Sequence, residues 1–269
     1  MKIETILTPA ELPALAGRDL RETCCVVFDV LRATSTIVTA LHNGAKAVIP
    51  VSEIAEALAF KKAEGGKRKA ETILLGGERD GVKIRAAQTG GIDFDLGNSP
   101  RECTPGMVRD RTIVSTTTNG TRALRACAGA KTVLAGSFLN LGATAEFIRK
   151  LQPAEALLVC AGTHEDAALE DALAAGALCE LLEVGSSRCD DRTAQRIVPT
   201  KKSDAAEIAR RAWMQAKADL AGAFQTSTNA RRLLAIPELR DDVAFCLQRD
   251  VFPLVARMEA DGAIRRQTA

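Results

Sequence analysis

The chain has 269 residues, 46% of them hydrophobic, and carries 36 basic and 34 acidic side chains for a net charge of +2. The apolar content is enough for one large core or two small ones, and the mixed charges, 3% aromatic content and absence of Tyr argue against a nucleic-acid surface. No apolar run approaches the roughly 20 residues of a membrane span, and no secretion signal opens the chain, so we expect a cytoplasmic protein without membrane contact.

Short apolar runs alternate with helical patterns along most of the chain. The apolar runs predict strands, which lie at 24–29, 47–51, 72–75, 112–115, 132–135 and 156–160. Helical patterns follow them, and we expect helices over 36–41, from 52 to about 63, from about 120, up to 151 and over 169–184. This alternation predicts an α/β protein, a three-layer α/β/α fold with a largely parallel central sheet.

The C-terminal part has a different pattern. Residues 203–248 are mostly helical in character, with breaks expected near Gly222 and Pro237, and 251–255 is a candidate last strand despite its Pro253. We expect one unit over residues 1–269; two lobes, about 1–130 and 131–269 with the site between them, are the alternative organisation. Whether the chain forms a homo-oligomer is left open. With eight Cys but no C-x-x-C pair, and only two His, a zinc site is not expected.

Polar and glycine-rich segments follow five of the predicted strands. In open α/β sheets, ligands bind beyond the carboxyl ends of the strands, where loops lead into helices. One such segment alone would be weak, but five at the same edge of a sheet would make a site. The segments are DVLRATST (29–36), GGER (76–79), TTTNGTR (116–122), GSFLN (136–140) and AGTHE (161–165).

Acidic side chains stand at two of these strand ends. Asp29 ends a buried strand and Glu78 ends another behind two glycines, and a buried carboxylate is costly unless it is paired or holds a metal. Such oxygen ligands suit Mg²⁺; an ion pair between Asp29 and Arg32 with a solvated Glu78 is the alternative. Glu170 and Asp171 open a predicted helix and are further candidate metal ligands, although the helix dipole alone accounts for acids there.

The segment 116–122 joins a strand to a helix with an unusual set of donors. Asn119 and Gly120 favour a sharp turn, and the free backbone N–H groups of a helix start attract anions. Hydroxyl and guanidinium donors add to them, from Thr117, Thr118, Thr121 and Arg122. The segment therefore predicts an anion site, with an ordinary Thr cap and Asn-Gly turn as the alternative. No Walker-type lysine loop is present, so a nucleoside triphosphate is not indicated.

Two further loops complete the candidate site. In the segment 93–100, Ser99 and Pro100 read as a helix start with Glu102 three residues after Ser99, which leaves Gly97 and Asn98 without a structural explanation. His164 follows another strand, but we interpret it as an exposed loop residue rather than a general acid or base.

Together these segments resemble the 2-phosphosulfolactate phosphatase family. The likeness rests, in the family's order, on VVFDVLRATSTIVTAL (26–41), GGERDGVKI (76–84), FDLGNSP (94–100), TTTNGTRAL (116–124), GSFLN (136–140) and AGTHEDAALED (161–171). Phe28 replaces a more usual aliphatic residue, and the last segment matches more loosely. The resemblance implies a Mg²⁺-dependent phosphatase with an α/β/α fold that converts 2-phospho-3-sulfolactate to 3-sulfolactate in coenzyme M biosynthesis.

The implied substrate carries phosphate, carboxylate and sulfonate groups. We expect the catalytic residues to be Asp29, Arg32, Glu78 and Asp171. We expect the substrate-binding residues to be Asn98, Ser99, Thr117, Thr118, Asn119, Gly120, Thr121, Arg122, Ser137, Asn140 and Gly162. Mg²⁺ on Asp29 and Glu78, with Glu170 or Asp171 completing or orienting its shell, would polarise the phosphoryl oxygen and activate a water; covalent attack by Asp29 is the alternative mechanism.

Two other functions compete with this one. A non-catalytic protein that binds a small anion would use the same loops, but the carboxylates would serve no purpose beside its ligand. A phosphatase for another 2-phospho-hydroxy acid, or a different hydrolase or transferase on a related fold, would share most of the site.

Overall fold

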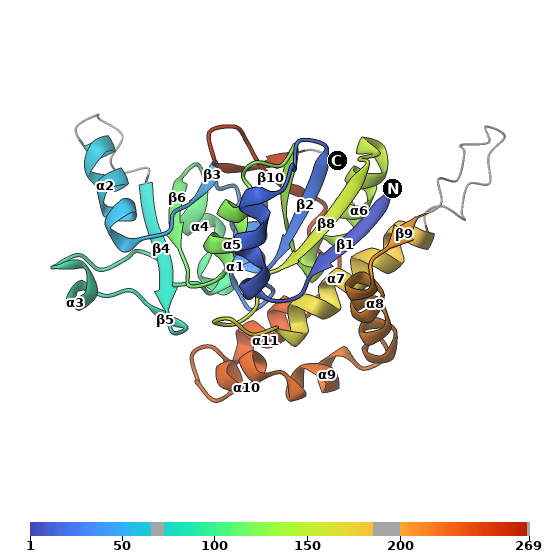
Figure 1. Ribbon diagram of the computed structural model, residues 1–269. Helices are drawn as coiled ribbons and strands as arrows, with labels where there is room; N and C mark the ends of the chain where they lie inside the picture. The colour runs from blue at the N-terminus through green and yellow to red at the C-terminus, as the bar shows by residue number, and fades with distance from the viewer. Residues whose placement is uncertain (66–72, 185–199, 268–269) are drawn as a thin grey trace.

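A computed structural model describes residues 1–65, 73–184 and 200–267 (Figure 1). Within these residues one sheet crosses the molecule with the strand order β5-β4-β6-β3-β11-β10-β7-β2-β8-β1-β9. The strands are β1 (Lys2–Ile6), β2 (Thr23–Phe28), β3 (Ala47–Pro50), β4 (Ile73–Arg79), β5 (Val82–Lys83), β6 (Thr112–Thr116), β7 (Thr132–Gly136), β8 (Glu155–Cys160), β9 (Lys201–Lys202), β10 (Val255–Met258) and β11 (Ile264–Gln267).

The sheet consists of two groups of parallel strands joined by a hairpin. The strands β4, β6 and β3 form one group, and β7, β2, β8 and β1 form the other. The antiparallel hairpin of β10 and β11 lies between them: Ala256 of β10 is opposite Ala135 of β7, and Ile264 of β11 is opposite Val48 of β3. The C-terminal hairpin is therefore what makes the two groups one sheet.

Helices cover both faces of this sheet and continue beyond one of its edges. The α-helices are α1 (Ala33–His42), α2 (Ile54–Gly65), α3 (Ala86–Thr89), α4 (Pro105–Val108), α5 (Gly120–Ala126), α6 (Leu141–Leu151), α7 (Leu169–Val184), α8 (Asp204–Ala216), α9 (Leu220–Thr226), α10 (Thr228–Leu234) and α11 (Arg240–Cys246), and the 3-10 helices are η1 (Pro9–Gly17), η3 (Pro100–Glu102) and η4 (Phe138–Asn140). Figure 1 shows α9 and α10, coloured orange, along the bottom of the fold, with α11 above α10. No helix in the described part of the chain is long and apolar enough to cross a bilayer.

The central strand β2 shows how the core is divided between the two faces. Successive side chains of a strand point to opposite faces, so Cys24, Val26 and Phe28 pack with α6, α7 and α8, while Cys25 and Val27 pack with η1, α1 and α5. A strand buried on both sides is apolar throughout, which is why this run is easy to recognise. The predicted three-layer α/β/α fold with a largely parallel sheet is confirmed.

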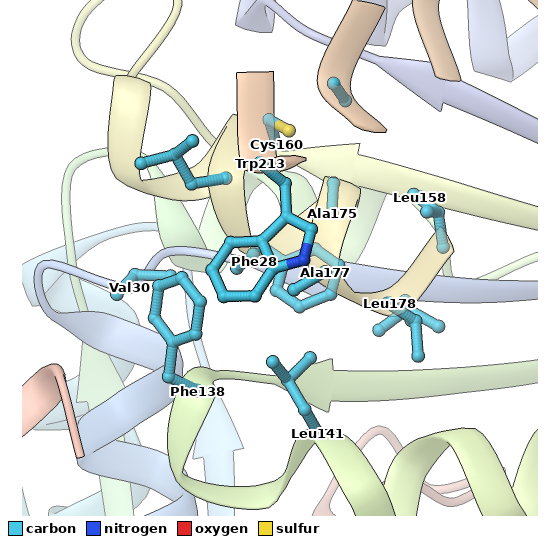
Figure 2. Packing of buried hydrophobic residues seen from close by; sticks show 14 of the residues in the cluster. Phe28, Val30, Phe138, Leu141, Leu158, Cys160, Ala175, Ala177, Leu178 and Trp213 are labelled. Carbon is cyan, nitrogen blue, oxygen red and sulfur yellow. The ribbon is translucent and has the colours of Figure 1, made fainter. Parts of the chain in front are cut away.

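Aromatic side chains pack together in the core between the sheet and α8 (Figure 2). Trp213 of α8 lies with its ring centroid 5.8 Å from that of Phe138, which follows β7. Phe28 at the end of β2 belongs to the same buried cluster. This cluster attaches the helical C-terminal part to the strands that carry the site.

Several expected elements differ in the structure. The strand β1 was not predicted, and it pairs with β8. The strand expected over 251–255 is β10, which begins at Val255 and does not cover 251–254, and the last strand is β11. The break near Gly222 is confirmed between α8 and α9, and Gly222 itself lies inside α9, whose start is capped by Asp219. The break at Pro237 is confirmed, between α10 and α11. The first residue of the predicted strand 72–75 lies outside the described residues.

The contact between α7 and α8 leaves no room for a side chain at Gly176. A Cβ there would lie 2.1 Å from the carbonyl oxygen of Ala209 and 2.8 Å from the Cβ of Trp213. We expect Gly176→Ala to lower the free energy of unfolding by about 1–3 kcal/mol, because overpacking outweighs the gain in helix propensity. Gly106→Ala in α4 is the matched control, since its Cβ would meet nothing within 4 Å. Urea unfolding curves compare the two, and equal midpoints would contradict the tight contact.

Candidate functional site

The loops that follow β2, β4, β6 and β8 line one cleft. The cleft contains about 480 Å³ of empty space, including part that is open to solvent. Seven of the expected site residues line it: Asp29, Arg32, Glu78, Asn98, Thr118, Asn119 and Gly162. The structure thus brings together residues that are as much as 133 positions apart, from 29 to 162, in the sequence.

Asp29 lies where β2 turns into α1. Its Oδ1 accepts a hydrogen bond from the backbone N–H of Ala33 at 3.0 Å, and its own N–H donates to the hydroxyl of Thr34 at 3.0 Å. The peptide bond between Leu31 and Arg32, in the same turn, is cis. Burial raises the pKa of Asp29 to about 7, and the nearby charges of Glu78 and Glu170 act in the same direction, against the Ala33 hydrogen bond. The positive charge of Arg32 opposes this rise in the pKa of Asp29, but burial and the neighbouring acids outweigh it.

Glu78 occupies the donors of the turn after β6. Its Oε1 accepts from the backbone N–H of Thr118 at 2.8 Å and from the Thr118 hydroxyl at 3.0 Å, and its Oε2 accepts from the N–H of Gly81 at 2.6 Å. The turn does hold an anion, but the anion is a carboxylate of the chain itself. Thr118 thus acts on the site by fixing Glu78.

Asn119 and Gly120 have separate roles in the same turn. The Nδ2 of Asn119 donates to the carbonyls of Ala161 and His164, both at 2.9 Å, so it ties this turn to the loop after β8. A Cβ on Gly120 would lie 2.6 Å from the Oδ2 of Asp29. Glycine is needed here for close approach of α5 to Asp29, and not for a positive φ.

Two acids at the start of α7, Glu170 and Asp171, accept hydrogen bonds from residues around the cleft. Asp171 accepts the backbone N–H of Val30 at 2.8 Å and that of Gly162 at 3.0 Å. Glu170 accepts from the hydroxyl of Ser227 at 2.5 Å and from the amide of Asn229 at 2.9 Å. Burial, together with the charges of Asp29 and Glu170, raises the pKa of Asp171 well above its usual range. Both acids hold other parts of the site and do not themselves line the cleft.

Arg32 forms a buried ion pair that the sequence did not predict. Its Nη1 donates to the Oδ2 of Asp242 in α11 at 2.7 Å, and its Nη2 donates to the carbonyl of Gly81 at 2.7 Å. The two side chains are 3% and 0% exposed. The other carboxylate oxygen of Asp242 accepts from the hydroxyl of Ser99 at 2.6 Å. Asp242, and not Asp29, is therefore the partner of Arg32.

Several residues expected to bind substrate do not line the cleft. Ser137 and Asn140 are fully buried and cap η4: the Asn140 side chain accepts the N–H of Ser137 at 3.0 Å. Thr117 and Thr121 are bonded to each other across the turn, with the Thr121 hydroxyl 2.7 Å from the Thr117 carbonyl. Arg122 is exposed and pairs with Glu165. These side chains have structural partners that account for them.

Other cleft residues were not named as site residues. Thr163 and His164 come from the loop after β8, which was expected at the site, whereas Asp80 comes from the β4–β5 turn and Asn229 and Arg232 from α10. The sequence indicated mostly helical structure over 203–248 but carried no signal for the position of α10 beside the strand ends, because that position is set by contacts distant in the chain.

The acids of the site do not form a cage of three or more metal ligands. Across residues 1–65, 73–184 and 200–267, no group of three or more His, Cys, Asp or Glu side chains is arranged to hold a metal ion. Mg²⁺ commonly takes only one or two carboxylates and completes its shell with waters and substrate phosphate. Asp29 and Glu78 fit this smaller arrangement, because both line the cleft and supply hard oxygen donors.

Comparison with known proteins gives one consistent result. A family model described as 2-phosphosulpholactate phosphatase matches residues 7–261. Similar curated proteins are named probable 2-phosphosulfolactate phosphatase. They include one from Caldanaerobacter subterraneus subsp. tengcongensis, 38% identical over 252 residues that make up 94% of each chain. Another, from Pseudothermotoga lettingae, is 40% identical over 90% of this chain and 92% of its own. A third, from Picosynechococcus sp., is 33% identical over 98% of both chains.

Substitution of two adjacent aspartates in α11, Asp242 and Asp241, tests the buried ion pair between Arg32 and Asp242. We expect Asp242→Asn to lower the free energy of unfolding by about 3–5 kcal/mol, because it leaves the buried Arg32 charge unpaired. Asp241→Asn is the matched control: Asp241 is 63% exposed and lies 3.2 Å from Arg101, so its loss should cost about 0–1 kcal/mol. Urea unfolding measures both variants. Similar losses for the two would show that the pair with Arg32 is not formed in solution.

Proposed function

Because the chain belongs to the 2-phosphosulfolactate phosphatase family, we propose that it hydrolyses the phosphate ester of 2-phospho-3-sulfolactate and releases 3-sulfolactate. One observation carries the proposal at the level of residues. Five of the six segments that resemble the family meet in a single cleft, where Asp29, Glu78, Thr118, Asn119 and Gly162 face the same space. The product has the carbon and sulfur skeleton from which coenzyme M is made, and we place the reaction in that biosynthesis.

The charges of the cleft favour a metal-dependent reaction. The acids Asp29, Glu78 and Asp80 line it, with Arg32 and Arg232 as the lining arginines among the described residues. Since Arg32 is already paired with Asp242, a phosphorylated acid would meet a predominantly negative surface. A divalent cation between these carboxylates and the phosphate removes that repulsion, so we propose Mg²⁺ on Asp29 and Glu78. When bound, Mg²⁺ would polarise a phosphoryl oxygen and lower the pKa of an attacking water.

The residues of the chain hold the carboxylates in place for this reaction. Thr118 and the N–H of Gly81 fix both oxygens of Glu78, and the N–H of Ala33 fixes one oxygen of Asp29. Hydrogen bonds from backbone N–H groups stabilise a carboxylate without neutralising it by a side-chain cation. The carboxylates are thus preorganised and remain able to attract a cation.

Asp171 and Glu170 have supporting roles in this proposal. Asp171 fixes the backbone next to Asp29 and at Gly162, on two sides of the cleft. Glu170 holds the start of α10. Neither side chain lines the cleft, so we assign them to orienting the site rather than to direct binding of Mg²⁺.

Phosphate release from 2-phospho-3-sulfolactate tests the proposal. We expect release by the unmodified chain to require Mg²⁺, and Asp29→Asn to lose about two to three powers of ten in kcat/KM, because a metal ligand supplies several kcal/mol of transition-state stabilisation. The asparagine retains an acceptor for the N–H of Ala33, so the melting temperature should not fall by more than a few degrees.

Asp19→Asn is the control, since Asp19 is exposed and pairs only with Arg21 among the described residues. Normal turnover by Asp29→Asn, or turnover that does not depend on Mg²⁺, would contradict the role of Asp29. Binding of the substrate without release of phosphate would favour the non-catalytic anion-binding protein.

A further inference from the structure

One arginine in the cleft has no partner of its own. Arg232 of α10 lines the cleft, is exposed, and forms no hydrogen bond or ion pair with any residue that the structure describes. The other arginine of the cleft, Arg32, has both terminal nitrogens engaged, by Asp242 and by the carbonyl of Gly81. Arg232 is therefore the guanidinium of this cleft whose charge and donors are available to a ligand.

The position of Arg232 is set by buried contacts at the start of its helix. Ser227 caps α10 by accepting the N–H of Ala230 at 3.3 Å, and the same hydroxyl donates to the buried Glu170. The Asn229 amide donates to Glu170 as well. Two contacts with one buried carboxylate thus fix the first turn of α10 against the cleft, and Arg232 lies one turn further on.

Arg232 also lies next to the turn that Glu78 organises. Its Nη2 is 3.6 Å from the position that a Cβ on Gly81 would occupy, and the N–H of Gly81 donates to Glu78. A small molecule whose phosphate is near Asp29 and Glu78 can therefore reach Arg232 with another of its charged groups. Planar guanidinium donors match the oxygens of a carboxylate or a sulfonate.

We propose that Arg232 binds one of the two anionic groups of the substrate other than the phosphate, the carboxylate or the sulfonate, and so selects phosphorylated acids over simple phosphate esters. The proposal rests on the proposed function, since it assigns a specificity residue to that reaction. Either a carboxylate or a sulfonate satisfies the chemistry of the guanidinium, and a set of substrates separates the two.

Four substrates and two variants test the role of Arg232. The substrates are 2-phospho-3-sulfolactate, 2-phospholactate, 2-phosphooxypropane-1-sulfonate and isopropyl phosphate, which carry both groups, the carboxylate alone, the sulfonate alone and neither. We expect Arg232→Ala to lower kcat/KM about tenfold to hundredfold on substrates with the recognised group, the range for hydrogen bonds to charged partners. On isopropyl phosphate we expect less than a twofold change. Arg231→Ala, which removes the neighbouring exposed arginine outside the cleft lining, should not alter kcat/KM on any of them.

The pattern over the four substrates decides the outcome. A loss on 2-phospholactate alone among the singly substituted compounds assigns Arg232 to the carboxylate, and a loss on the sulfonate compound alone assigns it to the sulfonate. A loss on both supports a site that accepts either. Equal losses on all four, isopropyl phosphate included, would overturn the proposal, because Arg232 would then act on the phosphate or on the fold. No loss on any compound would overturn it too.

Binding of the product separates this proposal from the proposed function. Calorimetry with 3-sulfolactate and Mg²⁺ measures the anion site without turnover. In one outcome no compound is hydrolysed, but Arg232→Ala binds 3-sulfolactate about tenfold or more weakly than the unmodified chain and Arg231→Ala do. The phosphatase function then fails and the anion site stands. If phosphate is released normally and Arg232→Ala matches the unmodified chain in kcat/KM and binding, the anion site fails and the phosphatase function stands. If no compound is hydrolysed and 3-sulfolactate does not bind the unmodified chain, both fail.

Discussion

A single buried carboxylate holds together the two loops on which the cleft is built. Asp171 accepts the N–H of Val30, just after β2, and the N–H of Gly162, just after β8. These strands are parallel neighbours, so their ends are already close, but free loops would leave in different directions. With both backbones bound to one side chain at the start of α7, Asp29 is fixed next to Val30, and the loop that receives Asn119 is fixed next to Gly162. These two hydrogen bonds therefore fix the backbone on two sides of the cleft.

The acids around this point are stabilised mainly by neutral donors. Backbone N–H groups, hydroxyls and the Asn229 amide supply the hydrogen bonds of Asp171, Glu78 and Glu170, and burial still raises the pKa of Asp29. Neutral donors lower the energy of a carboxylate but leave its charge in place. The site therefore keeps a negative potential that a cation can satisfy, whereas Arg32, the buried arginine nearby, is neutralised by an acid from α11.

Much of this could be predicted from local patterns, and the remainder depends on contacts that are distant in the chain. Continuous apolar runs identified the buried strands such as β2, and the rule that ligands bind at strand ends located Asp29, Glu78, Thr118 and Gly162 in advance. The same rule failed at Ser137, because a hydroxyl after a strand can equally well cap the helix that follows. Arg32 and Asp242 are 210 positions apart, and no local pattern specifies such a pair. The position of Arg232 in the cleft could not be predicted either, because it too depends on contacts between residues that are distant in the chain.

The hairpin of β10 and β11 also determines when the sheet can be completed. Chain synthesis proceeds from the N-terminus, so β3 and β7 both leave the ribosome well before the segment 255–267 that lies between them in the sheet. Until that segment emerges, each group of parallel strands presents an open edge of unpaired N–H and C=O groups where the other group will later be joined, and such edges are prone to pair with other chains. The nascent chain thus passes through an interval in which the strands of the site can be formed while the sheet is still two pieces. The two inner edges of the sheet are therefore open to pairing with other chains until residues 255–267 have been made.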